Sequence, residues 1–115
     1  MTDDLYCKIY VDAPLEKEAM KQLIMEISGG TSIARSITTD VFEIAVFKSR
    51  LGALSGGADF LYWPYYLEVE AVNDVTGEEV FVAALASLIR GLKARGFGAV
   101  PSCSFEDQLL PLVGS

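Results

Sequence analysis

The sequence contains no histidine among its 115 residues. Histidine is the side chain that most often acts as a general base, activates a serine or cysteine nucleophile, or binds zinc and copper. We therefore expect a protein that is not an enzyme and that needs neither a cofactor nor a metal ion. The glycine-rich residues 52–57 do not change this expectation, because they lack the Gly-Lys-Ser/Thr ending of a phosphate-binding loop.

Positively charged residues are scarce. Nine Lys and Arg residues stand against sixteen Asp and Glu residues, which gives a formal net charge of −7. Proteins that bind nucleic acid carry a basic surface that replaces phosphate counterions, so we expect no nucleic-acid partner. From Leu51 to Ile89 there are six acidic residues and no Lys or Arg. Such a stretch is either a solvated acidic surface or a patch that attracts a basic partner.

Long apolar runs and cysteines are also scarce. No run of about 18 apolar residues is present, so we expect no membrane-spanning segment. The first four residues, Met-Thr-Asp-Asp, lack the positive charge of a secretory signal. The two cysteines, Cys7 and Cys103, stand near opposite ends of the sequence. We therefore expect a cytoplasmic protein in which both are separate thiols.

Hydrophobic residues make up 51% of the sequence, and they recur with clear periods. The length predicts one domain over residues 1–115. Alternation predicts strands over 5–11, 32–38, 41–47, 60–72 and 98–104. Helical spacing predicts one helix over 14–28, capped by Asp12, and another from the Thr76/Glu79 capping box to Gly96. Residues 105–115 are expected to form a tail, and Pro64 and Pro101 to mark edge strands or bulges.

This order of elements, β-α-β-β-β-α-β, predicts an α+β fold. We expect a ferredoxin-like sandwich with both helices on one face of a mostly antiparallel, five-stranded sheet. The opposite face would then have no covering layer. The odd positions of strand 60–72, including Trp63 and Tyr65, should face the core. The side chains expected on the uncovered face are Tyr6, Lys8 and Tyr10 from the first strand, and Phe60, Tyr62, Tyr66, Glu68 and Glu70 from the long strand.

Two segments are similar to a known group of proteins. They are Phe60-Leu61-Tyr62-Trp63-Pro64-Tyr65-Tyr66-Leu67-Glu68-Val69-Glu70 and the stretch from Gly96-Phe97-Gly98 to Gln108-Leu109. They resemble small bacterial proteins of uncharacterised function, some of which are immunity proteins of polymorphic-toxin systems. The resemblance implies a small acidic protein that blocks a basic toxin domain, and it implies no catalytic residues.

The leading hypothesis is a non-catalytic protein-interaction module. It would bind a basic protein partner through an acidic, tyrosine-rich sheet face, because tyrosine buries area at interfaces while its hydroxyl stays hydrogen-bonded. The residues expected to bind the partner are Tyr6, Tyr10, Tyr62, Tyr66, Glu68 and Glu70. The alternative is a small-molecule-binding or regulatory domain that acts as a homodimer. A cation site at Glu68/Glu70 or Glu106/Asp107 also stays open.

Overall fold

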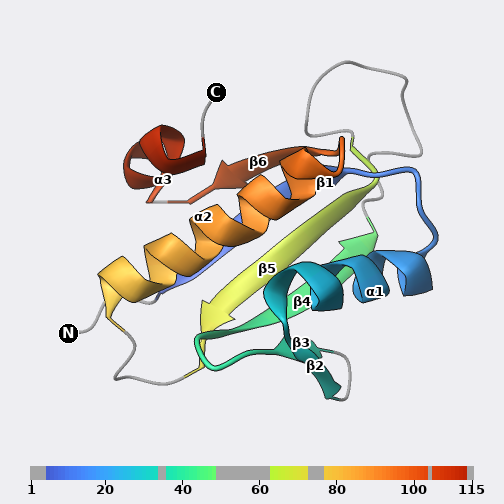
Figure 1. Cartoon of the computed structure of the whole chain (residues 1–115), viewed down its shortest axis with the longest axis horizontal. Helices are drawn as coiled ribbons and strands as arrows, with labels where there is room; N and C mark the ends of the chain where they lie inside the picture. Colours follow the sequence, from blue (N-terminus) through green and yellow to red (C-terminus); the bar gives the residue numbers. More distant parts are fainter. Residues whose placement is uncertain (1–4, 34–35, 49–62, 73–76, 104, 114–115) are drawn as a thin grey trace.

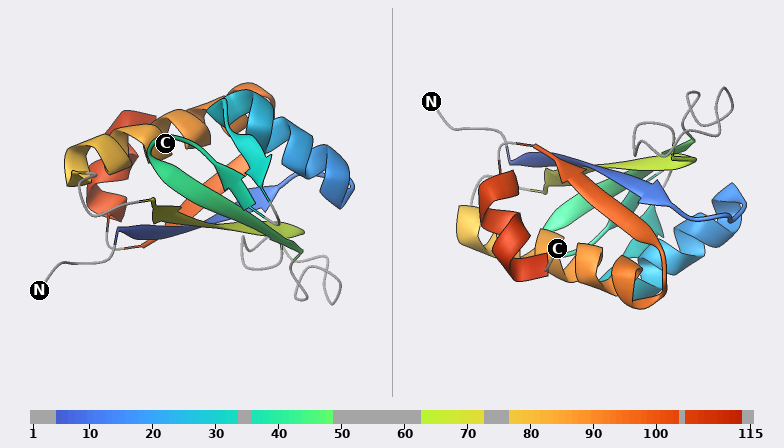
Figure 2. Two further views of the ribbon diagram at one scale, coloured as in Figure 1. Left: turned by 90° about the horizontal axis from the view of Figure 1, so that it is seen from below. Right: turned by 90° about the horizontal axis from the view of Figure 1, so that it is seen from above.

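The computed structural model describes residues 5–33, 36–48, 63–72, 77–103 and 105–113. In this part of the chain, six strands form one antiparallel sheet. Three helices pack together on one face of this sheet (Figure 1, Figure 2). The α+β class and the antiparallel sheet are therefore confirmed. One strand and one helix more than expected are present, and both have identifiable causes.

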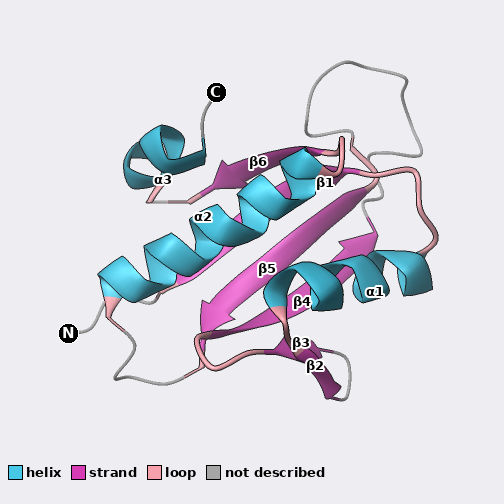
Figure 3. Ribbon diagram, in the orientation of Figure 1, coloured by secondary structure: helices cyan, strands magenta, loops and turns pink. Residues whose placement is uncertain are grey.

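The secondary structure follows a simple order along the chain (Figure 3). The strands are β1 (Tyr6–Asp12), β2 (Thr31–Ile33), β3 (Ser36–Thr38), β4 (Phe42–Lys48), β5 (Tyr65–Ala71) and β6 (Gly98–Ser102), and the helices are α1 (Lys17–Ser28), α2 (Glu78–Ala94) and α3 (Glu106–Val113). The strand order across the sheet is β2-β3-β4-β5-β1-β6. Strands β1 and β5, which carry most of the predicted site residues, are therefore neighbours in the interior of the sheet.

The core lies between the sheet and the helices. Every second residue of β1, β4 and β5 is buried there, which is the period expected when only one face of a sheet is covered. The buried side chains of these strands are Cys7, Ile9, Val11, Phe42, Ile44, Val46, Tyr65, Leu67 and Val69. Helix α2 supplies the largest opposing set, including the fully buried Phe81. Tyr65, Leu67 and Val69, at odd positions of β5, therefore face the core as predicted.

Tyr65 fixes the connection between β1 and α1. Its side chain is only 1% exposed, and its hydroxyl donates a hydrogen bond of 2.5 Å to the carbonyl oxygen of Leu15. This connection is longer than predicted, because Asp12 ends β1 and the helix begins at Lys17 after the N-cap residue Glu16. A residue before proline avoids helical backbone angles, so Ala13 before Pro14 favours an extended link.

Helix α2 also begins later than the predicted capping box. Its N-cap residue is Gly77, whose backbone makes the first helical hydrogen bond, from Phe81 N–H to the Gly77 carbonyl. The prediction of Thr76 as the cap was wrong. The helix ends as expected, with Gly96 at a positive φ of 86° that favours glycine.

The sixth strand arises because residues 32–38 do not form one strand. They belong to two short strands, β2 and β3, which pair antiparallel with Thr31 opposite Thr38. Ile33 and Ile37 therefore do not share a face: Ile33 is 58% exposed, whereas Ile37 is 2% exposed. Strands of three residues are too short for a period-2 pattern to reveal the reversal.

The predicted long strand 60–72 is shorter than expected. Residues 60–62 lie outside the described part, and β5 begins only at Tyr65. Pro64 precedes the strand, and β5 pairs with β4 and β1 on its two sides. The interpretation of Pro64 as a sign of an edge strand or bulge was therefore wrong. The interpretation of Pro101 was right, since β6 is an edge strand.

The predicted tail is a helix, α3. Phe105, just before it, and Leu109 within it are both buried. The Phe105 ring lies 5.8 Å from the Phe81 ring in an edge-to-face contact. Pro111 lies inside this helix and argued against it in the sequence, because proline removes a helical hydrogen bond. Packing against α2 offsets that loss.

Candidate functional site

The second face of the sheet has no helix over it in the described part of the chain (Figure 2). We call it the open face and define it by the strand residues that alternate with the buried ones. On β1, β4, β5 and β6 it comprises Tyr6, Lys8, Tyr10, Asp12, Glu43, Ala45, Phe47, Tyr66, Glu68, Glu70, Gly98, Val100 and Ser102. Five predicted site residues (Tyr6, Tyr10, Tyr66, Glu68 and Glu70) lie on it, whereas Tyr62 lies outside the described residues.

One end of the open face is acidic. In the strand register Glu70 stands opposite Glu43 on one side and opposite Tyr6 on the other. Both carboxylates are exposed. Like charges directly opposite each other on antiparallel strands destabilise the pair. This row therefore carries an electrostatic cost that a bound cation would relieve.

The next row along the strands contains Lys8, which stands opposite Glu68. The Lys8 ammonium lies 4.4 Å from the centroid of the Tyr66 ring and 5.1 Å from that of the Tyr10 ring. An ammonium group over an aromatic face is stabilised by the ring quadrupole, by about 0.5–1 kcal/mol at exposed sites. Within the described part of this face, Lys8 is the single cation beside three glutamates.

The third row is aromatic. Phe47, Tyr66 and Tyr10 follow one another across β4, β5 and β1. The Phe47 and Tyr66 rings are stacked, with centroids 5.1 Å apart and an interplanar angle of 18°. The Tyr66 and Tyr10 rings are tilted, with centroids 6.4 Å apart. Tyr66 is thus the centre of a partly exposed aromatic strip that crosses three strands.

Trp63 lies against Gly98 and not in the core, so its predicted position on the core face was wrong. A methyl group added to Gly98 would lie 2.7 Å from the indole ring. Because the next residue, Ala99, is buried on the helix side, such a methyl group would point to the open side. Glycine at this position therefore makes room for the only tryptophan of the sequence.

The Tyr6 hydroxyl lies near carboxylates of the open face. Burial raises the pKa of its hydroxyl, and the neighbouring Glu68 carboxylate raises it further. Both effects disfavour a second negative charge at this place. The proton of Tyr6 is therefore held more tightly in the folded protein than in the unfolded chain.

The raised pKa of Tyr6 predicts a loss of stability in alkali. Above about pH 10 the unfolded chain releases the tyrosine proton while the folded protein retains it, so the free energy of unfolding falls as pH rises. We expect Tyr6→Phe to weaken this fall and to leave the stability near pH 8 largely unchanged. Urea unfolding measured between pH 8 and pH 11 checks this. Parallel profiles for the wild type and Tyr6→Phe would contradict it.

Several residues of the open face were missing from the prediction, among them Glu43 and Phe47. Both alternate with the core residues Phe42, Ile44 and Val46, so the sequence was sufficient to predict that their side chains point away from the core. Their place next to Tyr66 and Glu70 was not readable, because it depends on the register between β4 and β5.

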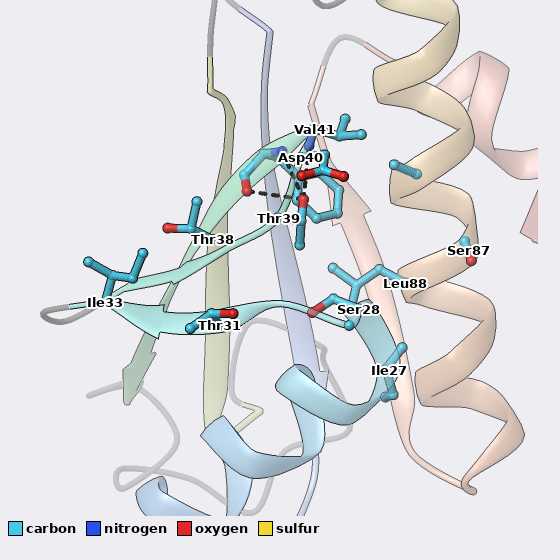
Figure 4. Close-up of a pocket in the computed structure, with 13 residues that line it drawn as sticks. Ile27, Ser28, Thr31, Ile33, Thr38, Thr39, Asp40, Val41, Ser87 and Leu88 are labelled. Atoms are coloured by element: carbon cyan, nitrogen blue, oxygen red, sulfur yellow. Dashed lines mark hydrogen bonds between the residues drawn. The ribbon is translucent and has the colours of Figure 1, made fainter.

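A separate pocket of about 460 Å³ lies on the helix side of the sheet (Figure 4). It is bounded by the end of α1, the β2–β3 hairpin, the turn before β4 and one side of α2. Two hydroxyl groups that line this pocket form hydrogen bonds with the backbone. Ser28 donates to the Ile24 carbonyl at 2.7 Å, and Thr39 accepts from the N–H groups of Val41 and Phe42 at 3.1 and 3.0 Å. These side chains stabilise the turns at the rim of the pocket.

Compared with protein-family models, curated proteins and solved structures, the chain matches none. Within the described ranges, none of the helices has the length and apolar character needed to cross a membrane. The same residues contain no group of three or more cysteine, aspartate or glutamate side chains placed to hold a metal ion. The open face is thus the surface from which a function is inferred.

Proposed function

We propose that this protein is a non-catalytic binding module whose open face receives a basic surface of another protein. The observation that carries the proposal is the juxtaposition, on one uncovered sheet face, of the aromatic row at Tyr66 with the glutamates Glu43, Glu68 and Glu70. An immunity-type inhibitor that blocks a basic toxin domain is one form of this function.

The aromatic row and the glutamates of the open face suit the two ways in which an arginine side chain binds. An arginine guanidinium stacks on aromatic rings and pairs with carboxylates through two parallel hydrogen bonds. Lys8 already makes the contact between a cation and aromatic rings, since its ammonium lies over Tyr66 and Tyr10. A partner arginine placed over the same strip would have Glu68 and Glu70 within the neighbouring rows.

Charge favours a basic partner over a second copy of the chain. The protein carries a formal net charge of −7. Two open faces placed together would bring two sets of glutamates into one interface, where like charges cost several kcal/mol. A basic partner removes the repulsion between Glu43 and Glu70 instead of doubling it.

We also propose that the frame behind this face is a ferredoxin-like βαββαβ unit. It would consist of β1, α1, β4, β5, α2 and β6, with the β2–β3 hairpin inserted and α3 appended. The strand order β4-β5-β1-β6 supports this, because each helix then connects two strands that flank a third.

The test uses a short, unstructured arginine- and lysine-rich peptide as the probe. We expect Glu68→Gln/Glu70→Gln to weaken its binding by about ten-fold, because two nearby attractions are lost. The matched control is Glu26→Gln/Glu79→Gln, which makes the same change in net charge at two exposed helix residues. Isothermal titration calorimetry at two salt concentrations measures both variants.

A purely long-range attraction would give a different result. If both variants lost affinity equally, the peptide would be responding to net charge and not to the open face. If neither variant lost affinity, Glu68 and Glu70 would have no part in binding. Either outcome would reject the proposed function.

A further inference from the structure

The pairing of β1 with β6 brings the two cysteines together. These strands are antiparallel, with Tyr10 opposite Val100, Ile9 opposite Pro101 and Lys8 opposite Ser102. Continued by one residue, the same register places Cys7 opposite Cys103. The sequence gives no sign of this, because the two residues stand near opposite ends of the chain.

Both cysteines lie on the helix side of the sheet. Cys7 is fully buried in the hydrophobic core, and Cys103 is half-buried and packs against the same core. Opposite residues on antiparallel strands have Cα atoms about 4.5–5.5 Å apart. Disulfides require Cα separations of about 4.4–6.8 Å. The expected separation therefore suits a disulfide for either kind of antiparallel pair.

We propose that Cys7 and Cys103 form an oxidation site at which hydrogen peroxide produces an intramolecular disulfide. Cys103 reacts first because it is the more exposed of the two. Its thiolate attacks one peroxide oxygen, the O–O bond breaks, and a sulfenic acid and water form. The Cys7 sulfur then attacks the sulfenic sulfur, which forms the S–S bond and releases a second water. The two thiols give up two electrons and two protons, and peroxide takes up both.

The bridge would tie the C-terminal part of the fold to an interior strand. Cys103 follows β6, an edge strand, and precedes Phe105, which packs on Phe81 of α2. A bond from Cys7 would hold this junction against β1. It would close a long loop of the chain, the case in which a disulfide most restricts the unfolded state.

The experiment treats the reduced wild-type protein with equimolar hydrogen peroxide. We expect peptide mapping without reductant to find the Cys7 peptide joined to the Cys103 peptide within one chain. We also expect the Tm to rise by about 10 °C or more and to return after reduction with dithiothreitol. Cys103→Ser should show neither the cross-link nor the rise.

The matched control moves the thiol by one residue. In Ser102→Cys/Cys103→Ser the new thiol points to the open face, opposite Lys8, and we expect no bond to Cys7. Three results would overturn the proposal: sulfinic acid at Cys103 with Cys7 still alkylated after unfolding, disulfides only between chains, or a bridge that forms as fast in the control. The peptide mapping is performed on the wild type, so its result does not depend on how well the variants fold.

Discussion

Phe81→Ala is expected to lower the free energy of unfolding by about 3–5 kcal/mol. Phe81 is fully buried at the point where the sheet, α2 and the C-terminal helix meet. Its ring makes edge-to-face contacts with two other rings. The ring centroids lie 6.2 Å apart for Phe42 of β4 and 5.8 Å apart for Phe105, just before α3. Truncation removes both ring contacts and leaves a cavity between three elements. Domains of this size have about 5–15 kcal/mol of stability, so the loss is a large part of it.

Denaturant unfolding followed by circular dichroism measures this effect. The control is Val80→Ala, a truncation at the neighbouring residue of the same helix, which is 53% exposed. It should change the stability by less than about 0.5 kcal/mol. Equal losses in the two variants would show that α2 does not pack on the sheet through Phe81.

Tyr66→Ala is expected to weaken binding of the basic peptide by about thirty-fold, which corresponds to about 2 kcal/mol. Tyr66 is the central ring of the aromatic row, stacked on Phe47 and next to Tyr10. The Lys8 ammonium lies 4.4 Å from the centroid of the Tyr66 ring. The substitution takes away the ring that lies between Phe47 and Tyr10, and both of these rings lose a contact.

Tyr66→Phe separates the role of the ring from that of the hydroxyl. It keeps the stacking surface and the face on which a cation rests, so we expect its affinity to stay within about three-fold of the wild type. Calorimetric titration of the wild type and both variants provides the comparison. Wild-type affinity in Tyr66→Ala, with the fold intact, would exclude the aromatic row as a binding surface.

The alternating strands could be predicted from the sequence because each one covers the core with one face only. In β1 the order Tyr6-Cys7-Lys8-Ile9 separates outward from inward side chains without any knowledge of the neighbours. The same holds for β5, where Tyr65 is buried and Tyr66 is not. This is why Tyr6, Tyr10, Tyr66, Glu68 and Glu70, the predicted site residues in the described part of the chain, lie on the face expected for them.

The short elements could not be predicted, because their stability comes from distant contacts. The β2–β3 hairpin has strands of three residues, and α3 contains a proline. Neither has a strong local pattern, and α3 forms where Phe105 and Leu109 find a buried place against the rest of the fold. Propensity is a weak guide when tertiary packing decides.

The arrangement of the site depended on register in the same way. Sequence alone could not place Phe47 beside Tyr66, or Glu43 beside Glu70, since a one-residue slip would turn either strand over. The position of Trp63 on Gly98 depends on a contact between residues far apart in the chain. Such contacts leave no periodic signal.

Chemical-shift mapping tests most directly whether the open face is the binding surface. Labelled protein is titrated with the basic peptide, and the side-chain carboxyl signals of the glutamates and the ring signals of the tyrosines are followed. We predict that the largest changes occur at Glu68, Glu70, Tyr10 and Tyr66, with little change at Glu26 or Glu79. Changes concentrated on α1, on α2 or around the pocket between Thr31 and Ser87 would contradict the account.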